Sequence, residues 1–395
     1  MNKVKDIFTT LGKGADSICR TCVDELKLIA KDEGILIFFI LVPLFYPLLY
    51  SFVYTNEVVR EVPVAVVDMS HSGMSRSFIR NFDASPDVKV AYYCNKLDEA
   101  KDLIGRQEAF GVLYFPTDFQ TKLNRMEQGH VSVYCDMSFM LYYKAVFQTA
   151  TAVAGELNAG IQINRAGNYT EREDEITTKP LDFEEVPIFN TTVGYGNFII
   201  PGVLILVLQQ TLILGVGLAA GTEYERRRKG LVQTTAVGIV GALSKLTGKS
   251  LSYLMIYSVL AAYITLVVPR IFDFTSLVHA SDLILFMLPF LLSCIFFAIT
   301  VSYVVRYREN VILMVVFTSV MFLFMSGVSW PQSSIPAFWQ GVSSLVPSTF
   351  AIRGFVRMNT MGALLGDVTP EYTALWIQTA VYFCTALWVT KKRNG

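Results

Sequence analysis

One stretch limits what this chain can fold into more than any other. Residues Phe198 to Gly221 form a charge-free, mostly apolar run that is long enough to cross a bilayer as a helix. The run ends just before the block Glu223-Tyr224-Glu225-Arg226-Arg227-Arg228-Lys229-Gly230. An apolar span followed by dense positive charge is typical of a membrane helix that emerges on the cytoplasmic side. The chain must therefore reach the opposite face before this run and return from the cytoplasm after it.

The composition agrees with a protein that is solvated largely by lipid. Of the 395 residues, 53% are hydrophobic and only 17% are charged, which is unlike the balance of soluble domains. The formal net charge is zero, so nothing in the charge indicates a nucleic-acid partner.

Six apolar segments are predicted to span the membrane. They are residues 35–54, 198–221, 251–269, 283–305, 311–328 and 372–390. Basic residues gather after the second and fourth segments and at the C-terminus, and the positive-inside rule places these parts in the cytoplasm. Both termini are then cytoplasmic. Residues 1–34 are basic, with apolar residues at helical spacing, and predict a cytoplasmic amphipathic leader helix on the membrane surface.

Residues 55–193 predict a separate α/β domain outside the cytoplasm. From Glu57 onward this region holds 20 acidic against 13 basic residues, an excess that opposes a cytoplasmic location. Short runs rich in β-branched residues alternate with amphipathic helical runs, as in a small α/β domain. The acidic segment 171–185 is expected to be a loop. Cys94 and Cys135 end or follow predicted strands, and the sequence leaves open whether they pair.

Residues 194–395 are expected to form a five-helix membrane domain with two special connections. The connection 222–250 is the only long cytoplasmic one, and we expect it to hold a short amphipathic helix over residues 238–246. Residues 329–366 are almost charge-free up to Arg353 but contain several prolines. Short re-entrant helices on the external side fit this pattern, and protein or water would have to satisfy their backbone groups.

The sequence contains no complete motif for nucleotide binding or hydrolysis. Gly248-Lys249-Ser250 resembles the end of a phosphate-binding loop, but that motif needs a glycine where Leu243 stands. Neither HExxH nor GxSxG occurs in the sequence. Gln209 and Gln210 are a conspicuous polar pair inside a span, and hydrogen bonding between helices is favoured over contact with a substrate.

Three segments carry a resemblance to a known family. They are GRQEAFGVLYFPTDFQTKL in the external region, PGVLILVLQQTLILGVGLAAGTEYERRRKG at the second span, and SGVSWPQSSIPAFWQGVSSLVPSTFAIRGF from Ser326 to Phe355. Together they resemble permease subunits of ABC-2 type transporters, in the subfamily of bacterial exporters with a large periplasmic domain between the first and second spans. The resemblance implies an α-helical polytopic membrane protein of the bacterial inner membrane with an inserted extracytoplasmic α/β domain.

The function that this resemblance implies is export. The chain would move substrate out of the cytoplasm or inner membrane with ATP hydrolysed by separate ABC ATPase subunits. No catalytic, cofactor or metal site is then expected in this chain. The resemblance also implies pairing with an identical or related permease, and a periplasmic adaptor leading to an outer-membrane channel. The alternative is a non-transporting membrane scaffold or sensor whose external domain binds a ligand or partner.

Two sets of residues are expected to carry the function. Coupling to the ATPase is expected at Glu223, Tyr224, Glu225, Arg226, Arg227, Arg228, Gly230, Gly238 and Leu243. A substrate path or dimer interface is expected at Phe198, Gln209, Gln210, Trp330 and Pro331. Substrate identity is not encoded in any of these patterns.

Overall fold

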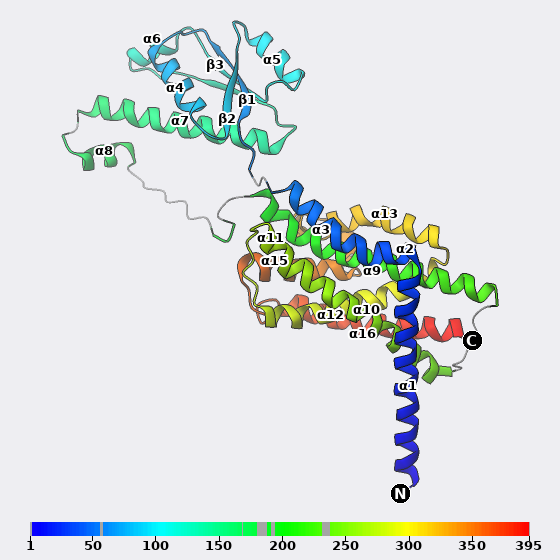
Figure 1. The fold of residues 1–395 in the computed structure, drawn as a ribbon. Coiled ribbons are helices and arrows are strands. Elements are labelled where there is room, and N and C mark those ends of the chain that lie inside the picture. The colour runs from blue at the N-terminus through cyan, green and yellow to red at the C-terminus, as the bar shows by residue number, and fades with distance from the viewer. Residues whose placement is uncertain are drawn as a thin grey trace. The chain divides into compact units, whose positions relative to one another are not determined.

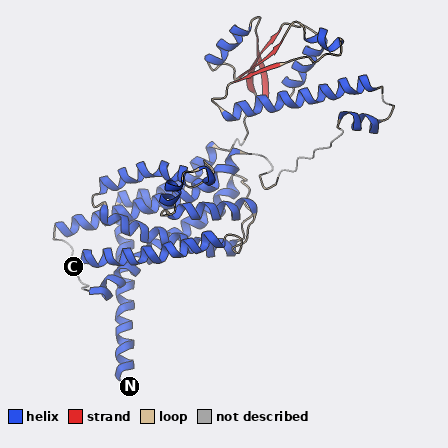
Figure 2. Cartoon of the chain, turned by 180° about the vertical axis from the view of Figure 1, so that it is seen from behind, coloured by secondary structure: helices blue, strands red, loops and turns tan. Residues whose placement is uncertain are grey.

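The computed structural model describes residues 2–55, 58–167, 169–179, 188–190, 194–230 and 238–394. They divide into two compact units, which we call the helical unit (Met1–Glu57 with Ile188–Gly395) and the α/β unit (Val58–Pro187). Figure 1 labels the elements, and Figure 2 shows that all described strands belong to the α/β unit.

The helical unit contains the six helices that are long and apolar enough to cross a membrane. Their bounds are Glu33–Val53, Tyr195–Arg228, Gly238–Ile271, Ala280–Val304, Arg308–Met325 and Thr369–Arg393. The elements are α2 (Glu33–Leu36), η1 (Ile37–Leu41) and α3 (Val42–Val53), then α9 (Tyr195–Arg228), α10 (Gly238–Ala262), η2 (Tyr263–Val267), α11 (Val268–Ile271), α12 (Ala280–Val304), α13 (Arg308–Met325) and α16 (Thr369–Asn394). The prediction of six candidate spans is confirmed.

Two of these spans contain a π-helical turn with a local cause. The turns η1 and η2 each lie just before a proline, at Pro43 and Pro269 respectively. Proline has no N–H to donate to the carbonyl four residues earlier. A wider π turn accommodates that lost hydrogen bond without ending the helix.

Helix α9 forms the centre of the helical unit. It packs against α3, α12, α13 and α15, and nearly every residue of its apolar part is buried. Two glycines allow this close packing. A Cβ at Gly215 would lie 1.7 Å from Phe39 Cδ2, and a Cβ at Gly217 would lie 2.5 Å from Val311 Cγ1. Small residues of this kind let helices approach closely where lipid provides no hydrophobic drive.

The remaining helices of this unit surround the bundle. Helix α1 (Asn2–Lys31) runs crosswise to the long helices and packs against α10 (Figure 1). Between α13 and α16 the chain forms η3 (Gln332–Ser334), α14 (Ala337–Ser343) and α15 (Pro347–Met361). Short helices were expected across residues 329–366. Helix α15 is buried against α9, α12 and α16 through Ala351, Ile352 and Phe355.

The α/β unit is built on a four-stranded sheet with the order β2-β1-β3-β4. Its strands are β1 (Val62–Asp68), β2 (Val88–Tyr93), β3 (Gly111–Phe115) and β4 (Ser132–Cys135). Strand β1 is parallel to β2 and β3, and β4 is antiparallel to β3. The central strand β1 is buried along most of its length, as expected where helices cover both faces of a parallel sheet.

Helices cover the two faces unequally. Helices α4 (Gly73–Asp83), α6 (Phe119–Asn124) and the long α7 (Met140–Ala166) contribute to the larger core, with Phe78, Phe82 and Phe115. Helix α5 (Leu97–Gly105) packs on the other face over Ala65 and Val112.

Two expectations for this region are resolved by the structure. Residues Glu171–Thr178 form helix α8 and not a loop. The missed signal is a capping box, in which the Thr170 hydroxyl accepts from the Glu173 N–H while the Glu173 carboxylate accepts from the Thr170 N–H. Cys94 and Cys135 are free thiols. They lie by β2 and β4 at opposite edges of the sheet, so they cannot reach each other.

The expected long connection 222–250 is mostly helical in its described part. Helix α9 continues to Arg228, and α10 begins at Gly238 and runs into the next span without a break. Residues 238–246 are helical, as expected, but the prediction of a short helix there was wrong, because they form the first part of α10, which continues to Ala262. Positive charge marks the end of the apolar span, but a helix continues past it because its backbone hydrogen bonds are internal. Residues 231–237 lie outside the described residues.

The close packing of α9 on the first span gives a direct test. We expect Gly215→Val to lower the stability of the folded protein by about 1–3 kcal/mol or to prevent folding, since the new side chain overlaps the Phe39 ring. The measurement is thermal unfolding of the detergent-purified chain. Gly341→Ala on α14 is the control, because a Cβ there meets nothing within 4 Å. Equal melting temperatures for both variants would contradict this packing.

Candidate functional site

A cluster of buried charges joins α1, α9 and α10 at one end of the helical unit. Glu223 lies at its centre. Its Oε1 accepts from Arg227 Nη2 at 2.9 Å and from Lys245 Nζ, and its Oε2 accepts from Lys249 Nζ at 2.8 Å. We call this group, together with Glu25 and Tyr253, the charge cluster.

Glu25 brings the N-terminal helix into the charge cluster. Lys249 Nζ lies 3.1 Å from Glu25 Oε2, and the Tyr253 hydroxyl donates to Glu25 Oε1. The side chain of Glu25 is 6% exposed, and that of Lys249 is 15% exposed. Lys249 thus bridges the buried Glu25 carboxylate and the largely buried Glu223 carboxylate, which come from two different helices. Charges removed from water in this way need such partners to remain ionised.

Helical spacing explains how these side chains meet. Glu223 and Arg227 are four residues apart on α9, while Lys245, Lys249 and Tyr253 recur every four residues on α10. Residues four apart lie on the same face of a helix. The stripe therefore covers about one turn of α9 and about two turns of α10.

Gly248 permits the contact between α1 and α10. A Cβ at Gly248 would lie 2.8 Å from the Ile18 carbonyl oxygen and 2.7 Å from Thr21 Cβ. The Ser252 hydroxyl donates to the Cys22 carbonyl at 3.1 Å. The Gly248-Lys249-Ser250 sequence therefore lies within α10, where it contacts α1. Its lysine binds carboxylates of this chain.

A second ion pair ties two further elements, α2 and α13, to α9 at the same end of the unit. Arg308, at the start of α13, donates through both terminal nitrogens to the two Asp32 oxygens at 2.9 Å. Thr222 of α9 also donates to Asp32 at 3.0 Å. Asp32 additionally accepts from the Ile35 N–H at 3.2 Å and so caps helix α2.

The environment of Asp32 favours its ionised form. Burial alone would raise the pKa of this carboxyl, but the hydrogen bonds from Arg308, the Ile35 N–H and Thr222 outweigh it, and the pKa lies below its ordinary value of 3.8. The bidentate geometry is the strong form of an arginine–carboxylate pair.

The C-terminal end of α16 joins the same basic region. Arg227 and Arg393 are linked, because Arg227 Nη1 donates to the Arg393 carbonyl. Arg393 in turn donates to the Ser302 carbonyl of α12 at 2.5 Å. Lys392 lies over the Trp388 ring. The ends of α9, α12 and α16 and the start of α10 are therefore joined by polar contacts.

The expected coupling residues separate into two groups. Glu223 and Arg227 belong to the charge cluster, and Tyr224 is half-buried with its ring packed edge-on against Tyr307. The exposed members are Glu225, Arg226, Arg228, Gly230, Gly238 and Leu243. Gly230 and Gly238 have positive φ angles of 71° and 91°, which glycine adopts without strain.

The first turns of α10 also expose apolar side chains, and sequence reasoning missed two of them, Ile239 and Val240. Ile239 and Val240, in the first turn of α10, are 58% and 72% exposed, and Leu243 follows at 39%. Exposed apolar side chains of this kind are suited to contact with a protein partner.

The residues expected in a substrate path or dimer interface do not form one site. Gln209 and Gln210 are buried, whereas Phe198, Trp330 and Pro331 are exposed. Gln209 Oε1 accepts from the Ser348 N–H at 2.6 Å and so satisfies a free donor in the first turn of α15. This is the interhelical hydrogen bond that was favoured for the pair. Neither polar atom of the Gln210 amide has a hydrogen-bond partner in the described part of the chain.

Several residues of this site were missed by sequence reasoning. They are Glu25, Asp32, Lys245, Lys249, Tyr253 and Arg308. For Glu25 a signal existed, since it continues the helical stripe of Cys22 and Ile29, both buried. Across the described residues, no group of three or more His, Cys, Asp or Glu side chains could hold a metal ion.

Comparison with known proteins places the chain in context. Residues 34–388 match the model of a family described as ABC-2 family transporter protein. No significant match to a curated protein or to a solved structure was found. The matched region includes the six candidate spans almost completely, together with the α/β unit.

The charge cluster predicts a large cost for removing its central cation. We expect Lys249→Met to destabilise the protein by about 3–5 kcal/mol, because Glu25 and Glu223 are then left buried without the lysine between them. Denaturant unfolding of the purified chain measures this. The control Arg226→Met removes an exposed charge at the end of α9 and should change stability by less than about 0.5 kcal/mol. Equal losses in both variants would refute the bridging role of Lys249.

The Asp32–Arg308 pair predicts a specific pH dependence. At pH 7, Asp32→Asn should cost about 1.5–3 kcal/mol, the value of hydrogen bonds to a charged group. Because the pKa of Asp32 is lowered on folding, the stabilisation is complete above 3.8 and is lost as the pH falls through the folded-state pKa.

Unfolding measured from pH 7 downward checks this sign. The difference between wild type and Asp32→Asn should stay constant to about pH 5 and shrink below about pH 4. Asp16→Asn is the control, since its pair with Arg20 is exposed and should contribute less than about 1 kcal/mol. A difference that grows toward acid would contradict the lowered pKa.

Proposed function

Because the chain belongs to the ABC-2 family of transporter proteins, we propose that it is the membrane-spanning subunit of an exporter driven by separate ABC ATPase subunits. The observation that carries the proposal is the family match over residues 34–388 of a chain with six candidate spans. Substrate would leave the cytoplasm or the inner membrane, and the chain would pair with an identical or related permease.

The charge distribution supports one orientation. The basic ends of α9 and α16 would face the cytoplasm under the positive-inside rule. Both termini would then be cytoplasmic, and the α/β unit, inserted between the first and second spans, would lie outside. In this orientation the unit is available to a periplasmic adaptor.

The ATPase would contact the exposed surface between α9 and α10. This surface consists of Glu225, Arg226, Arg228, Ile239, Val240 and Leu243. The charge cluster lies on the same two helices and connects α9, α10 and α1 through largely buried ion pairs. A movement imposed on the surface would therefore move these three helices together. Glu223 and Arg227 act as internal braces in this proposal and the exposed residues as contacts.

Purification with and without native partners tests the function. The chain expressed alone should hydrolyse no ATP, and the tagged chain from its native membranes should retain ATPase subunits whose hydrolysis is inhibited by vanadate. Val240→Asp should reduce the recovered ATPase about tenfold or more, since it places a charge in the apolar contact. Asp in the first turn of a helix is favourable, so folding should persist.

Val240→Ile is the matched control and should recover the ATPase as wild type does. If no ATPase accompanies the native chain, the scaffold or sensor alternative replaces the exporter. If Val240→Asp retains the full complement of ATPase, the contact surface lies elsewhere and the assignment of α9–α10 is wrong.

A further inference from the structure

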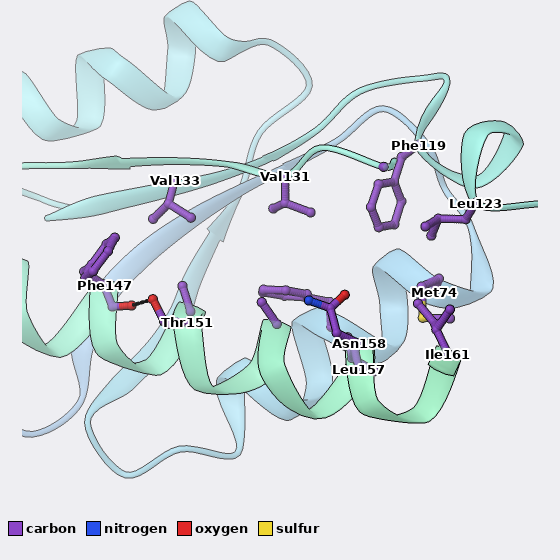
Figure 3. Close-up of a pocket in the computed structure, with 14 residues that line it drawn as sticks. Met74, Phe119, Leu123, Val131, Val133, Phe147, Thr151, Leu157, Asn158 and Ile161 are labelled. Atoms are coloured by element: carbon purple, nitrogen blue, oxygen red, sulfur yellow. Dashed lines mark hydrogen bonds between the residues drawn. The ribbon is translucent and has the colours of Figure 1, made fainter. Parts of the chain in front are cut away.

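The α/β unit contains an apolar pocket that the transport function does not use. It has a volume of about 300 Å³ and opens to the surface between α7 and the ends of α4, α6 and β4. Figure 3 shows its labelled side chains projecting into one space. This volume is at the lower end of the range of about 300–1,000 Å³ that is usual for small-molecule sites.

The pocket arises from a change in side-chain size along α7. Phe147 and Ile161 border it on this helix, while Ala150, Thr151 and Ala154 lie between them. These positions follow helical spacing on the face toward the sheet. Short side chains in the middle of the stripe leave a hollow that larger residues would have filled as part of the core.

The opposite wall is held in place by packing. The Phe119 ring stacks edge-on against Phe115, which packs in the same way on Phe78. A Cβ at Gly129 would lie 3.1 Å from Leu123 Cγ, so this segment already fits tightly against α6. Arg165 Nη2 donates to the Leu123 carbonyl at 2.9 Å and ties the end of α7 to this wall. The hollow is therefore pre-formed.

The lining restricts the chemistry of an occupant. Among the described residues no charged side chain lines the pocket, and the polar ones in the lining are Thr151 and Asn158. The Thr151 hydroxyl already donates to the Phe147 carbonyl at 2.8 Å. Burying a charged ligand here would leave its charge uncompensated. A neutral hydrocarbon chain fits instead, with its polar end near the Asn158 amide, which lies exposed on α7.

We propose that the α/β unit binds a neutral small molecule with a single hydrocarbon chain in this pocket. The occupant inserts between α7 and the Phe119–Leu123 wall, and its hydroxyl-sized polar group stays at the mouth beside Asn158. Phe78 and Phe119 form the base of the site, and Ala154 provides its depth. This proposal does not depend on the direction of transport or on the ATPase.

Photolabelling of the full chain in lipid nanodiscs tests the site. The probe is dodecanol carrying a diazirine on its chain, with plain dodecanol as competitor. Labelled peptides are mapped by mass spectrometry. Saturable labelling is expected within residues 119–133 and 147–161, and it should disappear with excess competitor.

Filling the pocket should remove this labelling. Ala154→Phe places a ring in the hollow and should reduce labelling about tenfold or more, whereas Ala152→Phe, on the same helix but outside the lining, should label as wild type does. Thr151→Phe is a second filling variant, at an exposed position of the lining, in case the first does not fold. Thermal unfolding of each variant checks that the fold is retained.

Two results would overturn the proposal. One is labelling that does not saturate or that is equal in Ala152→Phe and Ala154→Phe, because the probe would then report the lipid phase. The other is protection of the pocket residues by a second copy of the chain or by an adaptor protein without any labelling by the probe, which would make the pocket part of a protein interface.

Discussion

The helical unit depends on the bridge that Lys249 makes between Glu223 and Glu25. These groups come from three helices, and no two of them are close in the sequence. Once they leave water, each charge is stable only if the others are present, so α1, α9 and α10 are fixed together as a set. An apolar contact could slide by a residue at little cost. A buried bridge between two carboxylates cannot, and it sets the register of the three helices.

The opposite kind of contact holds the middle of α9. There Gln209 Oε1 accepts from the Ser348 N–H of α15 and the Thr211 hydroxyl accepts from the Tyr257 hydroxyl of α10, while the closest contacts are those of glycines against Phe39 and Val311. Packing of this kind is close but has little directional restraint. The α9 helix is therefore held by ion pairs at its basic end and by close packing with a few buried hydrogen bonds along its apolar part.

Local patterns in the sequence were sufficient for the six spans and for the α/β alternation, because length, hydropathy and period are properties of single segments. The end of α9 was not predictable in this way, since charge at Glu223 to Arg228 indicates where lipid ends and not where the helix does. Glu25 was not singled out from the sequence, although it continues the stripe of the buried Cys22 and Ile29, and its partner Lys249 lies on a distant helix. The Gln209 hydrogen bond depends on where α15 begins, and the residues around Gln209 carry no information about that position. The capping box of α8 was a local signal and could have been found.

Gln210 is a place in the helical unit where buried polar atoms lack hydrogen bonds. Its amide is buried, and neither polar atom has a partner in the described part of the chain, although each such atom costs about 1–3 kcal/mol when left unpaired. The oxygen of the adjacent Gln209 accepts a hydrogen bond from the first turn of α15. Of these two neighbouring amides, only that of Gln209 therefore has such a bond among the described residues.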